Sequence, residues 1–215
     1  MGFLDVLKRS LKQEIKRDVN REISKGIRTG VSKAVDGAVG AVKESVGKGK
    51  SSSQTFTFGT YPKTVEELKA LPEATLDSAF KTTALAILAL MRYEENRDDA
   101  IAMLNYLSGP ESLGQRELQF LQDRLKDKFY KVKSFFEGAT VENNYSPNEP
   151  LKITVYETPY SFDEENYATM YVVSAGADEK RGVKLRRKPS TNQWFITELQ
   201  CLGDIRIPAA ENAWA

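Results

Sequence analysis

The side chains with the most obvious potential for chemistry are two groups of carboxylates. Glu94, Glu95, Asp98 and Asp99 lie close together, and a second acidic group occupies residues 163–165. Closely spaced carboxylates can bind Ca²⁺ or act as an acid and base pair. Neither group has the spacing of a calcium-binding loop, so we favour the alternative of hydrated residues at a helix end and a turn. We therefore predict no metal and no cofactor.

The usual means of activating a nucleophile is missing from the sequence. There is no histidine, which removes the commonest general base near neutral pH, and Cys201 is the single cysteine. A lone cysteine excludes an internal disulfide and a cysteine-based zinc site, and it fits a reducing cytoplasm. We expect Cys201 to be a small core residue, since no histidine exists to activate it. The protein is therefore expected not to be an enzyme.

Aromatic side chains gather around an Asn-rich loop and the segments after it. Most of these rings should pack within a sheet, but four tyrosines are candidates for a groove that binds a peptide or small ligand: Tyr145, Tyr156, Tyr160 and Tyr171. Basic residues at 186–188 beside Trp194 and Phe195 have the composition of a nucleic-acid site. An edge hairpin protected by charge explains them equally well. Because the surrounding region is acidic, we do not expect nucleic acid as a partner.

These side chains must be positioned by a hydrophobic core, which we expect around residues 84–91. This run of eight apolar residues is the longest in the chain. It would cover only about 12 Å as a helix, whereas a bilayer needs about 20 apolar residues. We predict a buried helix that starts at Thr75 and reaches about Glu95. Such a helix must be covered on every side by the elements around it.

The remaining pattern predicts the α+β class. Three further helices are expected, one after the capping box Thr64-x-x-Glu67, one over residues 98–108 and one over residues 112–136. Alternating, β-branched segments then predict four strands, at 151–158, 168–175, 182–188 and 193–200. Short connections indicate antiparallel pairing, so the helices should pack on a four-stranded antiparallel meander.

A different pattern occupies residues 1–46, which we interpret as a separate, basic, amphipathic helical extension. Apolar residues recur at every fourth position and form a predicted membrane or assembly face: Leu7, Leu11, Ile15, Val19, Ile23, Ile27 and Val31. Each step of four overshoots a 3.6-residue turn, so the stripe implies a supercoil or a break near Gly26 and Gly30. A predicted basic surface accompanies it: Lys8, Lys12, Lys16, Arg17, Arg21 and Lys25.

Charge and composition divide the chain in the same region. Residues 1–50 hold 12 basic and 6 acidic residues, a net charge of +6, while the remainder holds 19 and 24, a net charge of −5. The stretch from Gly47 to Gln54 has the composition of a flexible linker. We therefore divide the chain into an extension (1–46), a linker (47–60) and a globular α+β domain (61–215).

The extension could contact one of three surfaces: an anionic membrane, a second copy of the chain, or the protein's own domain. Basic residues around an apolar arc can attach to an anionic membrane surface, and the same residues can flank a helix seam in a homo-oligomer. The third alternative is docking on the protein's own acidic domain. We expect a cytoplasmic protein, peripherally attached to membrane in the first case, whose α+β domain binds another protein.

Several short motifs resemble a bacterial family of uncharacterised proteins over about residues 61–215. They are FFEGAT at 135–140, NNYSP at 143–147, SAGAD at 174–178, VKLR at 183–186, QWF at 193–195 and DIRIP at 204–208. The resemblance implies a bacterial, cytoplasmic protein and no particular activity. Helices followed by an antiparallel meander also look like the NTF2-like cone fold. That analogy implies an alternative function, a domain that binds or converts a small ligand.

Overall fold

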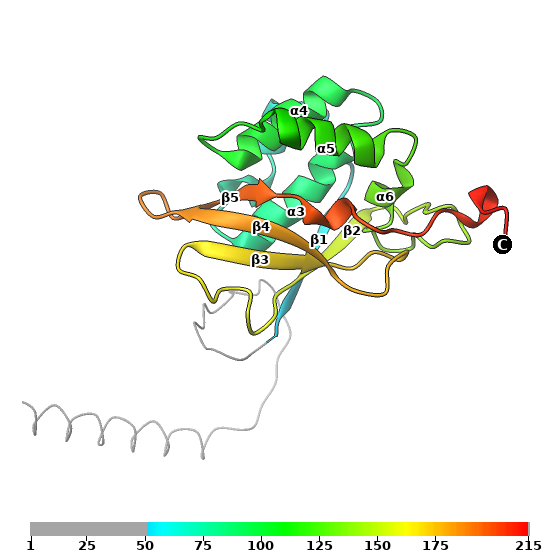
Figure 1. Cartoon of the computed structure of the whole chain (residues 1–215). Coiled ribbons are helices and arrows are strands. Elements are labelled where there is room, and N and C mark those ends of the chain that lie inside the picture. The colour runs from blue at the N-terminus through cyan, green and yellow to red at the C-terminus, as the bar shows by residue number, and fades with distance from the viewer. Residues whose placement is uncertain (1–50, 215) are drawn as a thin grey trace, which may run out of the picture. The chain divides into compact units, whose positions relative to one another are not determined.

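The fold consists of an antiparallel sheet with helices on one face, as Figure 1 shows. The structure, a computed structural model, describes residues 51–214. The five strands lie in the order of the chain, and every neighbouring pair is antiparallel: β1 (Ser53–Phe58), β2 (Leu151–Tyr156), β3 (Tyr167–Val172), β4 (Arg181–Lys188) and β5 (Gln193–Glu198). The predicted α+β class is confirmed.

The helices lie between β1 and β2 in the sequence. They are α2 (Val65–Lys69), α3 (Ala79–Leu90), α4 (Arg97–Ser108), α5 (Gln115–Leu125) and α6 (Tyr130–Lys133). Three short 3₁₀ helices are η1 (Pro72–Thr75), η2 (Gln200–Leu202) and η3 (Ala209–Glu211). No helix within residues 51–214 has both the length and the apolar character needed to cross a bilayer.

The prediction of four strands is wrong, because the sheet has a fifth strand, β1. Residues 53–58 fall in the stretch that we interpreted as a linker. They pair along their whole length with β2, from Ser53 opposite Tyr156 to Phe58 opposite Leu151. The serines before them resemble a linker, and the partner strand is about a hundred residues away, so no hairpin signal marks β1. The predicted helical extension at 1–46 lies outside the described residues.

The expected core helix is present as α3, although its ends differ from the prediction. Every residue of α3 except Lys81 is buried. Its N-cap is Ser78, whose hydroxyl accepts a hydrogen bond from the amide of Phe80 at 3.3 Å. The predicted cap Thr75 instead ends η1, and Leu76 follows in a left-handed conformation with φ +55°. The helix ends at Leu90, before the charged residues at 94–95.

The other helix predictions are partly confirmed. Thr64 caps α2 as expected, accepting from the amide of Glu67 at 3.2 Å. The helix expected over 112–136 is two helices, α5 and α6. Asp127 lies between them with φ +58°, a left-handed conformation that a continuous helix does not allow.

The alternation of side chains along the strands places one face of the sheet against α3. On β2, Leu151, Ile153 and Val155 are buried, while the residues between them are only half-buried. β3 repeats the pattern with Ala168, Met170 and Val172. α3 contacts β2, β3 and β5, and α4 covers α3 from the other side. The core is therefore a helix enclosed between a sheet and a second helical layer.

Two hydrogen bonds join the β5 edge of the sheet to α3 and to the segment just before it. The amide of Trp194 donates to the carbonyl of Leu76 at 2.8 Å, and its carbonyl accepts from the hydroxyl of Thr82 at 3.0 Å. The Thr82 hydroxyl also contacts the carbonyl of Ser78 at 3.3 Å. The neighbouring hydroxyl, that of Thr83, is buried without a hydrogen-bond partner among the described residues.

Replacing these adjacent threonines by valine should have opposite effects on stability. Thr82→Val removes a hydroxyl that bonds the sheet edge and leaves the part-buried carbonyl of Trp194 unpaired, so we expect it to lower the free energy of unfolding by about 1–2 kcal/mol. Thr83→Val removes an unpaired buried hydroxyl without changing the side-chain shape, so it should be neutral or stabilising by about 1 kcal/mol. Urea unfolding of both variants measures the difference. Equal losses from both variants would contradict the assigned hydrogen bonds.

Candidate functional site

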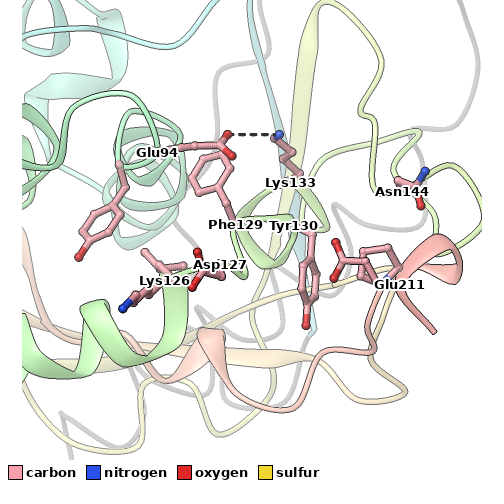
Figure 2. Close-up of a pocket in the computed structure, with 11 residues that line it drawn as sticks. Glu94, Lys126, Asp127, Phe129, Tyr130, Lys133, Asn144 and Glu211 are labelled. Carbon is pink, nitrogen blue, oxygen red and sulfur yellow. Dashed lines mark ion pairs between the residues drawn. The ribbon is translucent and has the colours of Figure 1, made fainter. Parts of the chain in front are cut away.

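A surface cleft of about 510 Å³ is lined by both aromatic and charged side chains (Figure 2). It is formed where the turn after α3, the α5–α6 region, the Asn-rich loop, and η3 with the residue before it meet. The lining residues are Tyr93, Glu94, Leu125, Lys126, Asp127, Phe129, Tyr130, Lys133, Asn144, Pro208 and Glu211. Such a mixture of rings and charged groups is typical of sites that bind polar ligands or peptide segments.

Two of the lining residues, Asp127 and Asn144, have a left-handed backbone conformation. Asp127 has φ +58° and separates α5 from α6, so that Phe129 and Tyr130 are turned toward the cleft. Asn144 has φ +54° in the loop before β2. Asp and Asn adopt this conformation more readily than most residues because their short side chains can form local hydrogen bonds. These two positions are therefore compatible with their unusual backbone.

A buried tyrosine supports the floor of the cleft. Tyr145 is 0% exposed, and its hydroxyl donates to the carbonyl of Arg206 at 2.9 Å. Its ring stacks on that of Tyr130, with centroids 5.6 Å apart. Burial, and secondarily the carboxylate of Glu211, raise the pKa of Tyr130. Tyr130 therefore stays protonated at neutral pH and can donate a hydrogen bond, but it is a poor general base.

The charges in the cleft are partly paired. Lys133 forms an ion pair with Glu94 at 3.4 Å, and its ammonium lies 5.1 Å from the centre of the Phe129 ring (Figure 2). Asp127 and Glu211 form no ion pair with any residue in 51–214. Lys126, which also lines the cleft, forms no ion pair within residues 51–214 either, so the cleft presents two carboxylates, one ammonium group and aromatic faces to the solvent.

The acidic group at 94–99 is held by an arginine. Arg92 forms ion pairs with Glu95 and, at 3.0 Å, with Asp99. The hydroxyl of Tyr61 donates to Glu95, and this hydrogen bond, together with Arg92, lowers the pKa of Glu95. Across residues 51–214, no cluster of three or more acidic or cysteine side chains has the geometry to hold a metal ion.

Cys201 is completely buried in η2. Burial raises the pKa of its thiol to about 12, so the reactive thiolate is absent at neutral pH. The expectation that Cys201 packs in the core agrees with this environment. Lys131 is similarly buried, with its ammonium donating to the carbonyl of Leu202 at 3.3 Å, and burial lowers its pKa.

The four tyrosines of the predicted groove are not brought together. Tyr156 and Tyr171 lie directly opposite each other on β2 and β3. Tyr145 is buried beneath the cleft, and Tyr160 is 77% exposed in the turn after β2. None of the four lines the cleft in Figure 2. The predicted membrane or assembly face and the predicted basic surface lie outside the described residues.

Sequence reasoning missed the residues that do line the cleft. Phe129, Tyr130 and Lys133 looked like parts of one long helix, and nothing nearby in the sequence links them to Asn144 or Glu211. No local signal in the sequence marks the break, because Leu125, Phe129 and Val132 continue the helical spacing across residues 126–128. Contacts between distant segments could not be predicted from spacing alone.

The fold is an α+β domain with a surface cleft beside α6. The chain belongs to the family described as Domain of unknown function (DUF6935), whose model matches residues 60–209. The resemblance to an uncharacterised family is thereby confirmed. No curated protein and no solved structure matches the chain significantly.

The burial of Cys201 predicts that the native thiol is inert. At pH 8 and with the chain folded, a thiol reagent such as DTNB should label Cys201 at least a hundred times more slowly than a free thiol, because the site is closed and the thiolate is disfavoured. Denaturation in guanidinium should then release one reactive thiol per chain. Rapid stoichiometric labelling of the folded protein would contradict the assigned burial.

Proposed function

We propose that this protein is a non-enzymatic, two-part binding protein. Residues 1–46 attach it to an anionic membrane surface, and the α+β domain binds a partner protein. The observation that carries the proposal is the opposite charge of the two parts, +6 over residues 1–50 and −5 over the remainder, combined with the apolar repeat in the first part. An anionic surface attracts the first part and repels the second, so the domain would be held away from the membrane.

The strength of attachment follows from the residues in the first part. Each basic residue near an anionic surface contributes about 1 kcal/mol, and burial of apolar side chains at the headgroup boundary adds to this. The acidic residues among the basic ones, such as Glu14 and Asp18, reduce the attraction. The attachment should therefore be reversible and sensitive to salt.

The cleft beside α6 supports the partner-binding role of the domain. Its free carboxylates, Asp127 and Glu211, and the rings of Phe129 and Tyr130 would suit a basic segment of another protein. The buried Cys201 and the paired acidic group at 94–99 provide no activated nucleophile and no evident acid and base pair in residues 51–214. These features favour binding over catalysis.

Self-assembly through residues 1–46 is the second candidate. The apolar repeat at every fourth position, from Leu7 to Val31, favours it, because a stripe with this period suits a supercoiled contact between helices. Membrane attachment and self-assembly use the same side chains. They can be separated by measuring mass in the absence of lipid.

The alternative of an NTF2-like ligand-binding domain or enzyme has less support. Such a domain needs a chamber between the sheet and its helices. Here α3 lies against the sheet with almost all of its side chains buried, including Leu85, Ile87 and Leu88. The cleft lies beside α6, at the periphery of this core, so a ligand would bind on the surface.

Charge reversal in the full chain tests the membrane attachment. Lys12→Glu with Lys16→Glu should abolish most sedimentation with phosphatidylserine-containing vesicles at low salt, because this double variant changes the charge of the predicted basic surface by −4. Lys48→Glu with Lys50→Glu makes the same charge change outside the apolar repeat and should retain most of the binding. Vesicles of phosphatidylcholine alone should bind none of the variants.

Two outcomes would reject this proposal. One is an unaltered chain that stays in the supernatant with anionic vesicles at low salt. The other is an equal loss of binding in the two double variants, because the total charge of the chain, and not the predicted basic surface, would then control vesicle binding. Light scattering without lipid tests the second candidate. A monomeric full chain would eliminate self-assembly through residues 1–46, whereas an oligomer supports it only if Leu11→Asp with Ile15→Asp, in the apolar repeat, abolishes the oligomer.

A further inference from the structure

The two edges of the sheet differ in how they are protected. At the β5 edge, both the amide and the carbonyl of Trp194 are occupied, by Leu76 and Thr82. The register between β4 and β5 is also irregular at Lys184 and Leu185. At the other edge, β1 pairs only with β2 among the described elements.

The pairing of β1 with β2 determines which backbone groups face outward. The amide of Glu157 donates to the carbonyl of Ser52 at 2.9 Å, in register with the rest of the pair. In an antiparallel pair of strands, residues whose amide and carbonyl bond to the partner strand alternate with residues whose amide and carbonyl point away from it. Gln54, Phe56 and Phe58 therefore bond to β2, while Ser53, Thr55 and Thr57 direct their amides and carbonyls away from the sheet. Within residues 51–214, no element pairs with these outward groups.

β1 lacks the features by which edge strands normally avoid pairing. Its sequence, SQTFTF, has no proline and no charged residue, and its register with β2 is regular. Natural edge strands are commonly protected by charge, proline, bulges or a covering element. Such an unprotected strand is competent to receive another strand.

We propose that β1 pairs antiparallel with β1 of a second copy of this chain. A register centred on Thr55 places Ser53 opposite the second copy's Thr57 and Thr55 opposite its counterpart. All three outward-facing residues of each copy would then be paired. This arrangement is isologous, so it closes as a dimer and does not propagate.

The side chains of β1 fit this register. On one face of the sheet, small hydroxyl side chains would meet each other, as Thr55 and Thr154 already do across β1 and β2, where their hydroxyl oxygens are 2.8 Å apart. On the other face, Gln54 would lie opposite the half-buried Phe56. No charge is present on either strand, so the two copies meet without repulsion. This absence of charge favours a second copy over a basic or acidic partner segment.

The dimer would join two sheets edge to edge. It would also carry two copies of residues 1–46 on one particle. Two weak, linked contacts bind a surface more strongly than one, so edge pairing would reinforce the attachment proposed above. The pairing itself does not depend on that attachment.

Cysteine cross-linking tests the register in the full chain. Residues in a hydrogen-bonded antiparallel pair have Cα atoms about 5.5 Å apart, which lies in the range for a disulfide. Thr55→Cys should therefore form a covalent dimer under mild oxidation. Thr154→Cys is the matched control, because it removes the same hydroxyl contact and lies opposite Thr55 on β2, one strand in from the edge. It should remain monomeric on a non-reducing gel.

Charge variants provide a second, reversible test by light scattering. Thr55→Lys should convert a dimeric chain into a monomer, because two ammonium groups would meet at the two-fold axis. Thr154→Lys should leave the dimer intact. A mixture of Thr55→Lys and Thr55→Glu chains should restore a heterodimer. Circular dichroism confirms that the variants are folded.

Three results would overturn the proposed edge pairing. The first is a monomeric unaltered chain at concentrations of tens of micromolar. The second is equal cross-linking of the Thr55→Cys and Thr154→Cys chains. The third is a dimer that survives in Thr55→Lys, which would assign assembly to another surface such as residues 1–46. None of these measurements uses vesicles. Rejection of the edge pairing would therefore leave the proposed membrane attachment unaffected.

Discussion

Burial of α3 is the constraint on which the rest of the structure depends. A helix that is apolar on nearly every side is stable in water only when other elements surround it. The sheet covers one side, α4 covers another, and the hydroxyl of Thr82 bonds the helix to Trp194 at the β5 edge. Because this space is filled, the cleft beside α6 lies at the surface of the domain and not between the sheet and α3.

Local sequence patterns were sufficient to predict much of this architecture. The apolar run at 84–91 located α3, the capping box at Thr64 located α2, and alternation located β2 to β5 to within a few residues. Features set by contacts between distant segments were missed. β1 begins at the last of three serines that resemble a linker, and its partner β2 lies about a hundred residues further along the chain.

The candidate site was harder to predict than the fold for the same reason. The cleft combines residues from four separate segments, and its shape depends on a left-handed turn at Asp127 that divides an expected helix. Of the four candidate tyrosines only Tyr156 and Tyr171 are neighbours, and neither lines the cleft. Tyr145 packs against Tyr130 without lining the cleft itself. The prediction for Cys201, which rested on the chemistry of a single residue, fared better. Cys201 is buried, and burial raises the pKa of its thiol, as expected for a core residue.

Amide hydrogen exchange of the native full chain tests the central role of α3 most directly. If the fold is organised around this helix, the amides in the middle of α3, near Leu85 and Leu88, should exchange only through global unfolding, with the same free energy as that measured by urea. Peripheral elements such as α2 and α6 should exchange through smaller local openings. Exchange of the α3 amides by local opening, ahead of the sheet, would contradict the account.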